Sequence, residues 1–204
     1  RFSNYYVNNM CFPTRASLLT GLYPKTALAD GSATKGFHPD LTTLPEALKT
    51  AGYATALIGK WHLAGNPKMP ENTFRPELMP NAQGFDYFYG TPRFNGFTVY
   101  VDDTPMRSRI MRNEETVVES VESWDYITQD YTREALTWIE ENKDQPFFLY
   151  LAHNLPHVPV GASEGFKGKS EYGPYGDTIE EIDWSSEQIL AKLKELGLDE
   201  NTLV

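Results

Sequence analysis

The sequence predicts an α/β fold in which helices cover both faces of a largely parallel sheet, giving a three-layer α/β/α domain. Two observations lead to this fold class. Strands and helices are predicted in the order strand, helix, strand, helix, strand. Residues 147–152 (Phe-Phe-Leu-Tyr-Leu-Ala) form a continuous apolar run, which is typical of a strand covered on both faces. The chain has 204 residues, enough for one domain with a sizeable core.

Composition excludes several classes of protein. The net charge of −10 and the pI near 4.9 argue against a nucleic-acid surface and leave no basic face for a membrane. No apolar run approaches the ~20 residues of a membrane span. Hydrophobic residues make up 40% and charged residues 23%, so the chain is globular and not disordered. One cysteine excludes an intrachain disulfide and leaves the redox compartment open.

The first predicted elements surround Cys11, the only cysteine. Residues 2–7 are expected to form a strand or an extended lead-in. Pro13 suits the first position of a short helix, because its missing N–H would be unpaired there, and Gly21 suits a left-handed cap at the end. Cys11 is therefore expected just before a helix N-terminus, where free amides favour negative charge. Arg15 lies one turn further on, so the stretch resembles a site for an anionic group.

Three other interpretations of Cys11 compete with an anion site. A lone cysteine is usually a small buried hydrophobe. A thiolate of the phosphatase type needs its arginine further along, with a loop of amides around the anion, whereas the spacing here is Cys-x-x-x-Arg. Metal binding through thiolates needs partners, and the chain has no second cysteine.

The next elements form a helix–strand unit. Thr43 suits the N-cap of a helix within residues 41–52, and Glu46 completes a capping box three residues later. Residues 53–59 then form a short buried strand. Further along, residues 65–80 are expected to form a surface loop, since they are rich in proline, asparagine and charge.

Lys60 and His62 directly follow the strand at 53–59. Continued extended alternation would point both side chains the same way. Ligands bind at the carboxyl ends of strands in open α/β sheets, so the pair is a candidate site. The alternative is a solvated lysine beside an incidental histidine.

The second half of the chain supplies two helices and a strand. Residues 124–143 and 177–196 carry apolar stripes at helical spacing, and the apolar strand at 147–152 lies between them. Residues 98–101 suit another strand, beside Arg107, Arg109 and Arg112, a basic cluster that is usually a solvated face.

Two histidines, His153 and His157, follow the strand at 147–152. Their spacing of four would place them on one helix face, as in zinc sites. Pro156 and Pro159 argue against a helix, so a loop at the strand end is expected.

Two segments carry a resemblance to a known family. Residues 11–15 (Cys-Phe-Pro-Thr-Arg), followed by Leu-Thr-Gly at 19–21, resemble the Cys-x-Pro-x-Arg-x-x-x-Leu-Thr-Gly signature of the type I sulfatases, the arylsulfatase family of the alkaline phosphatase-like superfamily. Thr14 stands where serine is common. Residues 59–63 resemble the family's Gly-Lys-Trp-His-Leu motif, with Ala64 where glycine usually follows. Residues 84–90 resemble a third stretch, expected to be structural.

The resemblance implies roles for six residues. Cys11 would be oxidised to formylglycine, whose hydrated aldehyde attacks the sulfur of a sulfate ester. Lys60 and His157 would bind the sulfate, and His153, a less secure match, would bind it or orient other groups. His62 would handle a proton. The negative charge that builds up in the transition state would be offset by Arg15, Lys60 and His157.

The resemblance also implies a metal and a larger domain. A calcium ion would contact the formylglycine formed from Cys11, and its carboxylate ligands would lie outside this chain. Residues 1–204 would be one partial sulfatase catalytic domain, preceded by a strand with an Asp-Asp pair. The residues at 202–204 would start a buried strand that leads to an Asp-Asn pair. The isolated piece is expected to be inactive.

The expected partners are a sulfated small molecule or glycan and the formylglycine-generating enzyme. The family suggests a secreted, periplasmic or lysosome-like location. Two alternatives remain for the function. One is a phosphonate or phosphodiester hydrolase of the same superfamily, and the other is a non-catalytic binding module.

Overall fold

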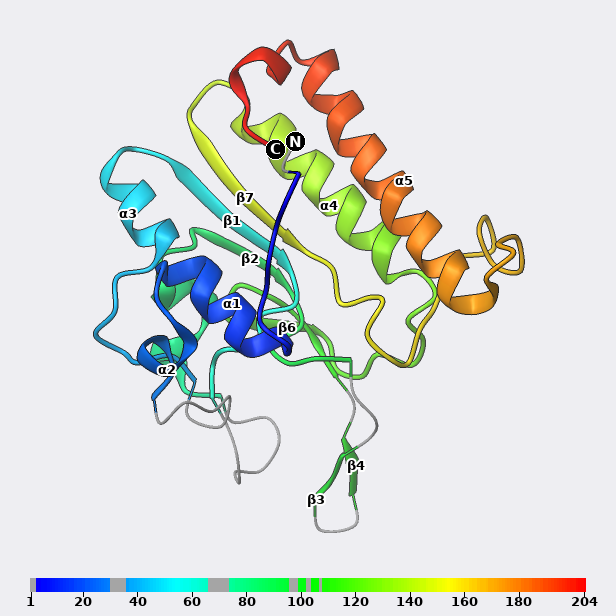
Figure 1. Ribbon diagram of the computed structural model, residues 1–204, viewed down its shortest axis with the longest axis horizontal. Helices are drawn as coiled ribbons and strands as arrows, with labels where there is room; N and C mark the ends of the chain where they lie inside the picture. Colours follow the sequence, from blue (N-terminus) through cyan, green and yellow to red (C-terminus); the bar gives the residue numbers. More distant parts are fainter. Residues whose placement is uncertain (1–2, 30–35, 66–73, 96–98, 102–103, 107) are drawn as a thin grey trace.

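A five-stranded sheet in the order β6-β5-β2-β1-β7 forms the middle of the molecule, as the computed structural model describes it for residues 3–29, 36–65, 74–95, 99–101, 104–106 and 108–204 (Figure 1). β1 (Ala54–Gly59) pairs in parallel with β2 (Tyr87–Gly90) and with β7 (Phe147–Ala152). β5 (Ile110–Arg112) and β6 (Glu115–Val118) add an antiparallel edge, which the sequence did not predict.

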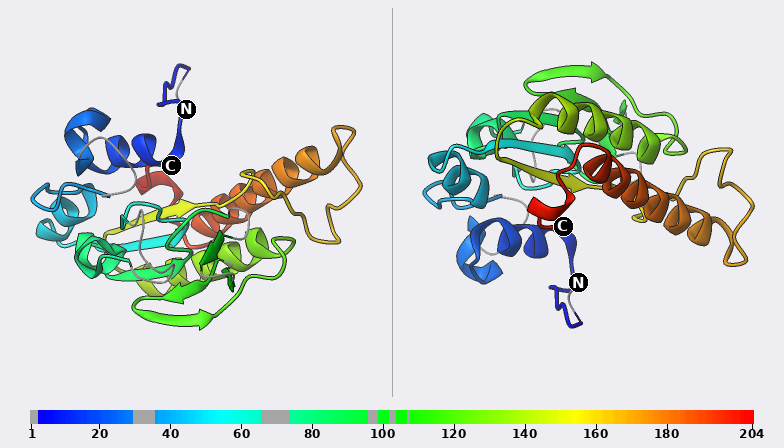
Figure 2. Two further views of the ribbon diagram at one scale, coloured as in Figure 1. Left: turned by 90° about the horizontal axis from the view of Figure 1, so that it is seen from below. Right: turned by 90° about the horizontal axis from the view of Figure 1, so that it is seen from above.

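Helices cover both faces of this sheet, so the predicted three-layer α/β/α fold is confirmed (Figure 2). One face carries α1 (Cys11–Thr20), α2 (Pro24–Ala27) and α3 (Leu44–Thr50). The other carries α4 (Ile127–Asn142) and α5 (Gly173–Glu195).

Each face of the sheet has its own apolar core. Leu57 on β1 packs with side chains of α1, whereas Ala56 and Ile58 pack with side chains of α4. The strand alternation that puts successive side chains on opposite faces therefore builds two cores from one strand. The apolar runs of β1 and β7 reflect this covering on both sides.

Helix ends follow the predicted chemistry in two places. The capping box at α3 is confirmed, because Thr43 Oγ1 accepts from the Glu46 amide at 3.4 Å while the Glu46 carboxylate accepts from the Thr43 amide at 2.7 Å. α1 ends at Gly21, whose φ of 69° is left-handed and whose amide donates to Ser17. The start of α1 differs from the prediction. Cys11 is its first residue and Pro13 its third, so the helix starts two residues earlier than expected.

Several other segments differ from their predicted structure. Residues 4–8 form no strand, and the tail 202–204 is likewise irregular with Leu203 almost fully exposed. Part of the predicted loop at 65–80 is two short 3₁₀ helices, Pro76–Leu78 and Pro80–Gln83. Leu78 is fully buried there, so this part of the loop is core; residues 66–73 lie outside the described residues.

The remaining elements are short. β3 (Val99–Val101) pairs with β4 (Thr104–Met106) in a separate hairpin, which confirms a strand near the predicted 98–101; residues 98 and 107 lie outside the described part. A last 3₁₀ turn spans Asp199–Asn201. Within the described ranges, no helix combines the length and apolar character that crossing a bilayer requires.

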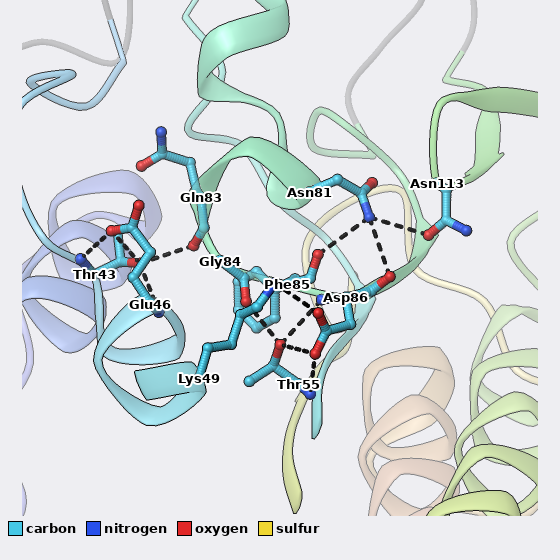
Figure 3. A network of polar contacts seen from close by, with 10 residues as sticks. All are labelled: Thr43, Glu46, Lys49, Thr55, Asn81, Gln83, Gly84, Phe85, Asp86 and Asn113. Atoms are coloured by element: carbon cyan, nitrogen blue, oxygen red, sulfur yellow. Dashed lines mark hydrogen bonds and ion pairs between the residues drawn. The ribbon is translucent and has the colours of Figure 1, made fainter. Parts of the chain in front are cut away.

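Asp86 ties the start of β2 to β1 and α3 (Figure 3). Its carboxylate accepts from the amide and the hydroxyl of Thr55, both at 3.0 Å, and pairs with Lys49 at 2.6 Å. The structural role expected for residues 84–90 agrees with this network, since its contacts join elements of the fold.

Candidate active site

The candidate site begins at the amino terminus of α1, where the Cys11 sulfur lies 3.3 Å from His62 Nδ1. Cys11 is half-buried, which disagrees with the competing interpretation of a buried structural cysteine. Lys60 also lies near Cys11, which partly opposes the lowering of the Lys60 pKa. The structure therefore brings together two motifs that are about fifty residues apart in the chain.

A turn after β1 presents Lys60 and His62 to Cys11. The Lys60 amide donates to Ala152 at 2.7 Å, and the His62 amide donates to Pro92 at 3.0 Å, so neighbouring strand ends hold the turn on both sides. Gly59 has a φ of 118°, and a Cβ there would lie 2.0 Å from the Ala152 carbonyl oxygen. Only glycine fits this close approach of β1 to β7.

The predicted alternation beyond β1 was wrong, although its conclusion about direction holds. β1 ends at Gly59, and His62 has a left-handed φ of 61°. Non-glycine residues rarely adopt this conformation, and such strain is concentrated at functional sites. Lys60 and His62 converge because the backbone turns, whereas Trp61 enters the core and donates its indole N–H to Leu78 at 2.8 Å.

Burial and mutual repulsion shape the charges of the site. Burial, with the neighbouring Arg15 charge, lowers the pKa of Lys60 from 10.5 to about 8, while Cys11 partly opposes this change. Burial, followed by the charges of Lys60 and Arg15, lowers the pKa of His62 from 6.5 to about 2. His62 is therefore neutral at ordinary pH, and the site holds positive charge that an anion would offset.

Arg15 extends from α1 to the ends of two strands. Its Nη1 donates to the Lys60 carbonyl at 2.6 Å and to the Tyr150 hydroxyl at 3.3 Å, and its guanidinium lies over the Tyr150 ring at 5.9 Å. Arg15 thus fixes the turn that carries Lys60 and adds its own charge to the pocket.

His157 lies at the rim of the site, in the predicted loop after β7. Its side chain is exposed, and its ring centroid lies 5.3 Å from that of Phe94, which in turn lies 4.9 Å from His62. The fully buried Asn95 donates to the carbonyls of His157 at 2.6 Å and Pro159 at 3.2 Å. The loop after β2 and the loop after β7 are therefore joined next to the exposed His157.

His153 does not share these contacts. Phe148 and Tyr150 of β7 face the α1 core, whereas the odd-numbered residues face the α4–α5 core, and His153 continues the odd set. Its Nε2 lies 3.2 Å from Ser185 Oγ on α5. Burial lowers the pKa of His153 to about 4. The geometry thus separates His153 from the group around Cys11, and its contact with substrate or its orientation of other groups stays a prediction.

Sequence reasoning missed three residues that follow β2: Arg93, Phe94 and Asn95. A usable signal was present, because β2 is parallel to β1 and β7 and its carboxyl end must meet theirs at one edge. The sequence of residues 84–90 indicates packing, and residues 93–95 carry no motif of their own.

The side chains near Cys11 do not by themselves form a calcium site. Calcium takes six to eight oxygen ligands, with carboxylates prominent among them. The charges that act on His62 here come from Lys60, Arg15, Arg93 and His157, all basic groups. In the described part of the chain, no group of three or more His, Cys, Asp or Glu side chains could hold a metal ion.

Comparisons with known proteins agree with this geometry. The family model described as Sulfatase matches residues 1–204. N-acetylgalactosamine-6-sulfatase of Mus musculus is 35% identical over 224 residues, covering 99% of this chain and 41% of that protein. Arylsulfatase of Hemicentrotus pulcherrimus is 32% identical over 221 residues, covering 100% of this chain and 39% of that protein. The chain therefore spans about two fifths of the length of these curated relatives.

A solved structure gives the same result for the fold. The crystal structure of the PsFucS1 sulfatase from Pseudoalteromonas sp. has a TM-score of 0.76 and 26% identity, covering 97% of this chain and 44% of that one. A match of the family model over the whole sequence, together with these relatives, means that the chain belongs to the sulfatase family.

Proposed function

We propose that this chain carries the nucleophile and part of the sulfate-binding site of a sulfuric ester hydrolase. The observation that carries the proposal is the placement of Cys11 at the amino terminus of α1, 3.3 Å from His62 and beside buried Lys60. Helix amides and nearby cations are a general means of holding a tetrahedral anion. Because the relatives of this chain are sulfatases, we propose sulfate as the anion.

Cys11 is proposed to act after conversion to formylglycine, with the formylglycine-generating enzyme as partner. The hydrated aldehyde then supplies a geminal diol. One diol oxygen attacks sulfur while the bond from sulfur to the alcohol oxygen breaks, and the proton lost by the attacking hydroxyl balances the one taken up by the departing alcohol. His62, which is neutral and adjacent to position 11, is proposed to accept the proton of the second diol hydroxyl, so that the aldehyde forms again as the C–O bond to sulfate breaks. A bound anion would offset the charges of Lys60 and Arg15, and the pKa of His62 would then rise toward its ordinary value.

Lys60, Arg15 and His157 are proposed to stabilise the charge that develops on the sulfate oxygens. Lys60 is almost fully buried, so its interaction with an anion is little screened by water. Arg15 is already anchored to the Lys60 carbonyl and contributes through its remaining donors. His157 is exposed at the rim, where it can meet an incoming substrate.

Residues 1–204 are proposed to be part of one sulfatase catalytic domain, and calcium is proposed as its metal. Because the side chains around Cys11 are basic, the carboxylate ligands are proposed to come from the rest of that domain. The proposed substrates are aryl or carbohydrate sulfates, and the proposed location is secreted, periplasmic or lysosome-like, as is usual for the family.

Two measurements test the proposal on the enzyme that carries this chain, produced together with a formylglycine-generating enzyme. Mass spectrometry of the peptide containing Cys11 should find formylglycine. Turnover of nitrophenyl sulfate should exceed that of a nitrophenyl phosphodiester, and Cys11→Ala should abolish it. Preferred turnover of the phosphodiester would support a phosphonate or phosphodiester hydrolase. An unmodified thiol with no turnover would favour a non-catalytic binding module.

A further inference from the structure

Phe94 lies at the centre of the basic side chains of the candidate site. Its ring centroid is 4.9 Å from that of His62 and 5.3 Å from that of His157, and the planes are tilted by 49° and 45°. Lys60 Nζ lies 5.9 Å from the same centroid, and the Arg93 guanidinium lies 6.0 Å from it. One uncharged ring thus contacts four groups that can carry positive charge.

The backbone on both sides of Phe94 is fixed. Ser108 Oγ donates to the Phe94 carbonyl at 2.9 Å, and Thr91 Oγ1 donates to the Arg93 carbonyl at 2.7 Å. Asn95, fully buried, binds the His157 loop through two hydrogen bonds. The backbone that carries the ring is therefore held in place before any ligand arrives, and a preorganised surface loses little freedom on binding.

The position of the ring defines what it can bind. It lies between His62, next to the nucleophile at position 11, and His157, which is exposed at the rim. The ring of Phe94 cannot donate a hydrogen bond to the sulfate oxygens, whereas the neighbouring cations can. The alcohol part of a sulfate ester must point away from the nucleophile, towards the rim, and so passes this half-buried ring.

We propose that Phe94 is a specificity-determining residue whose ring packs against the ring of the alcohol or phenol in the sulfate ester. Arenes stack on aromatic faces, and the apolar C–H face of a pyranose can pack there too. The assignment rests on the proposed function and adds a substrate feature to it: a ring directly bonded to, or one carbon away from, the ester oxygen.

The test compares ring-dependent and ring-independent binding in the enzyme that carries this chain, with position 11 converted. For Phe94→Ala we expect the KM for nitrophenyl sulfate to rise about tenfold. The inhibition constant of inorganic sulfate, which has no ring, should stay within about twofold, since the cations are retained. Phe94→Tyr keeps the ring and should remain near the wild type.

A matched control separates this role from simple packing. Phe12 also meets the His62 ring, at 6.3 Å and 77°, but it belongs to the core beneath α1. Phe12→Leu should leave the ratio of the two constants unchanged. Should Phe94→Ala fail to fold, Phe94→Leu, which keeps most of the volume, carries the same comparison.

The outcomes distinguish the two proposals. An active wild type in which Phe94→Ala shifts both constants together, or neither, overturns the specificity role and leaves sulfate hydrolysis standing. A wild type that turns over no sulfate ester overturns the proposed function and this assignment with it.

Discussion

His62 combines a strained backbone with a side chain placed against Cys11. Asparagine tolerates the left-handed region, whereas a β-branched residue does not. The free energy of unfolding of His62→Asn should therefore lie within about 1 kcal/mol of the wild-type value. Its sulfatase turnover should fall by about 100-fold or more, because the proposed proton acceptor is lost. His62→Val should lose stability as well. Urea unfolding and turnover of nitrophenyl sulfate measure the two effects, and full activity in His62→Asn would contradict the role.

His153 gives a stability effect that depends on pH. Burial lowers its pKa to about 4 in the folded protein, from an ordinary value of 6.5. Between these values the unfolded chain binds the proton and the folded protein does not. Stability is therefore complete above pH 6.5 and is lost as the pH falls below it. For a fall from pH 7 to 5, this single group should lower the free energy of unfolding by about 2 kcal/mol.

The variant His153→Gln should remove the part of the pH-dependent loss of stability that comes from His153. Urea unfolding at both pH values measures it. His62 contributes a loss of the same sign, so His153→Gln should reduce the pH dependence without removing it. A pH dependence in His153→Gln equal to that of the wild type would contradict this account.

The strands bring the site together where glycine permits their closest approach. At Gly59, a Cβ would lie 2.0 Å from the carbonyl oxygen of Ala152, whereas at Gly52 it would meet nothing within 4 Å. Both glycines have positive φ, 118° and 81°. Gly52→Ala should cost only the backbone strain, about 1 kcal/mol, and Gly59→Ala should cost at least about 3 kcal/mol because β1 and β7 must separate. Equal costs in denaturant unfolding would exclude the close approach as the cause.

The prediction of elements succeeded where local chemistry decided the outcome. The capping box of Thr43 and Glu46 and the apolar run of β7 act within a few residues, and both were found. The antiparallel strands β5 and β6 were missed, because β6 is mostly exposed and each is only three or four residues long. Such short strands carry little periodic signal, and their pairing is decided by contacts distant in the sequence.

The candidate site was predictable to the extent that motifs carry it. Cys11, Lys60 and His62 come together as the resemblance implied, since the motifs lie at strand and helix ends that share one edge of the sheet. Phe94 belongs to no such motif, and its place follows from the register of β2 with β1. Likewise, the separation of His153 from the site depends on which face of β7 it continues.

At the scale of the whole molecule, β7 is an incompletely covered part of the sheet. It forms an edge, its six residues are all apolar, and five of them are only partly buried. A cavity of about 430 Å³ beside it is lined by residues of α4, α5 and the tail as well as by β7. An apolar edge strand with free backbone groups is a template for pairing with another chain.

We therefore expect residues 1–204 alone to self-associate and to lack sulfatase turnover, the latter because the basic site, as far as the structure describes it, contains no set of calcium ligands. Leu190, 51% exposed, lines the cavity, whereas Val117, 43% exposed, lies on β6 at the opposite edge. Leu190→Lys should lower self-association in sedimentation experiments, and Val117→Lys should not, because only the former places a charge beside the apolar edge. Equal effects of the two lysines would exclude the β7 edge as the surface of association. Robust turnover by residues 1–204 would show that the acidic ligands are not needed from elsewhere.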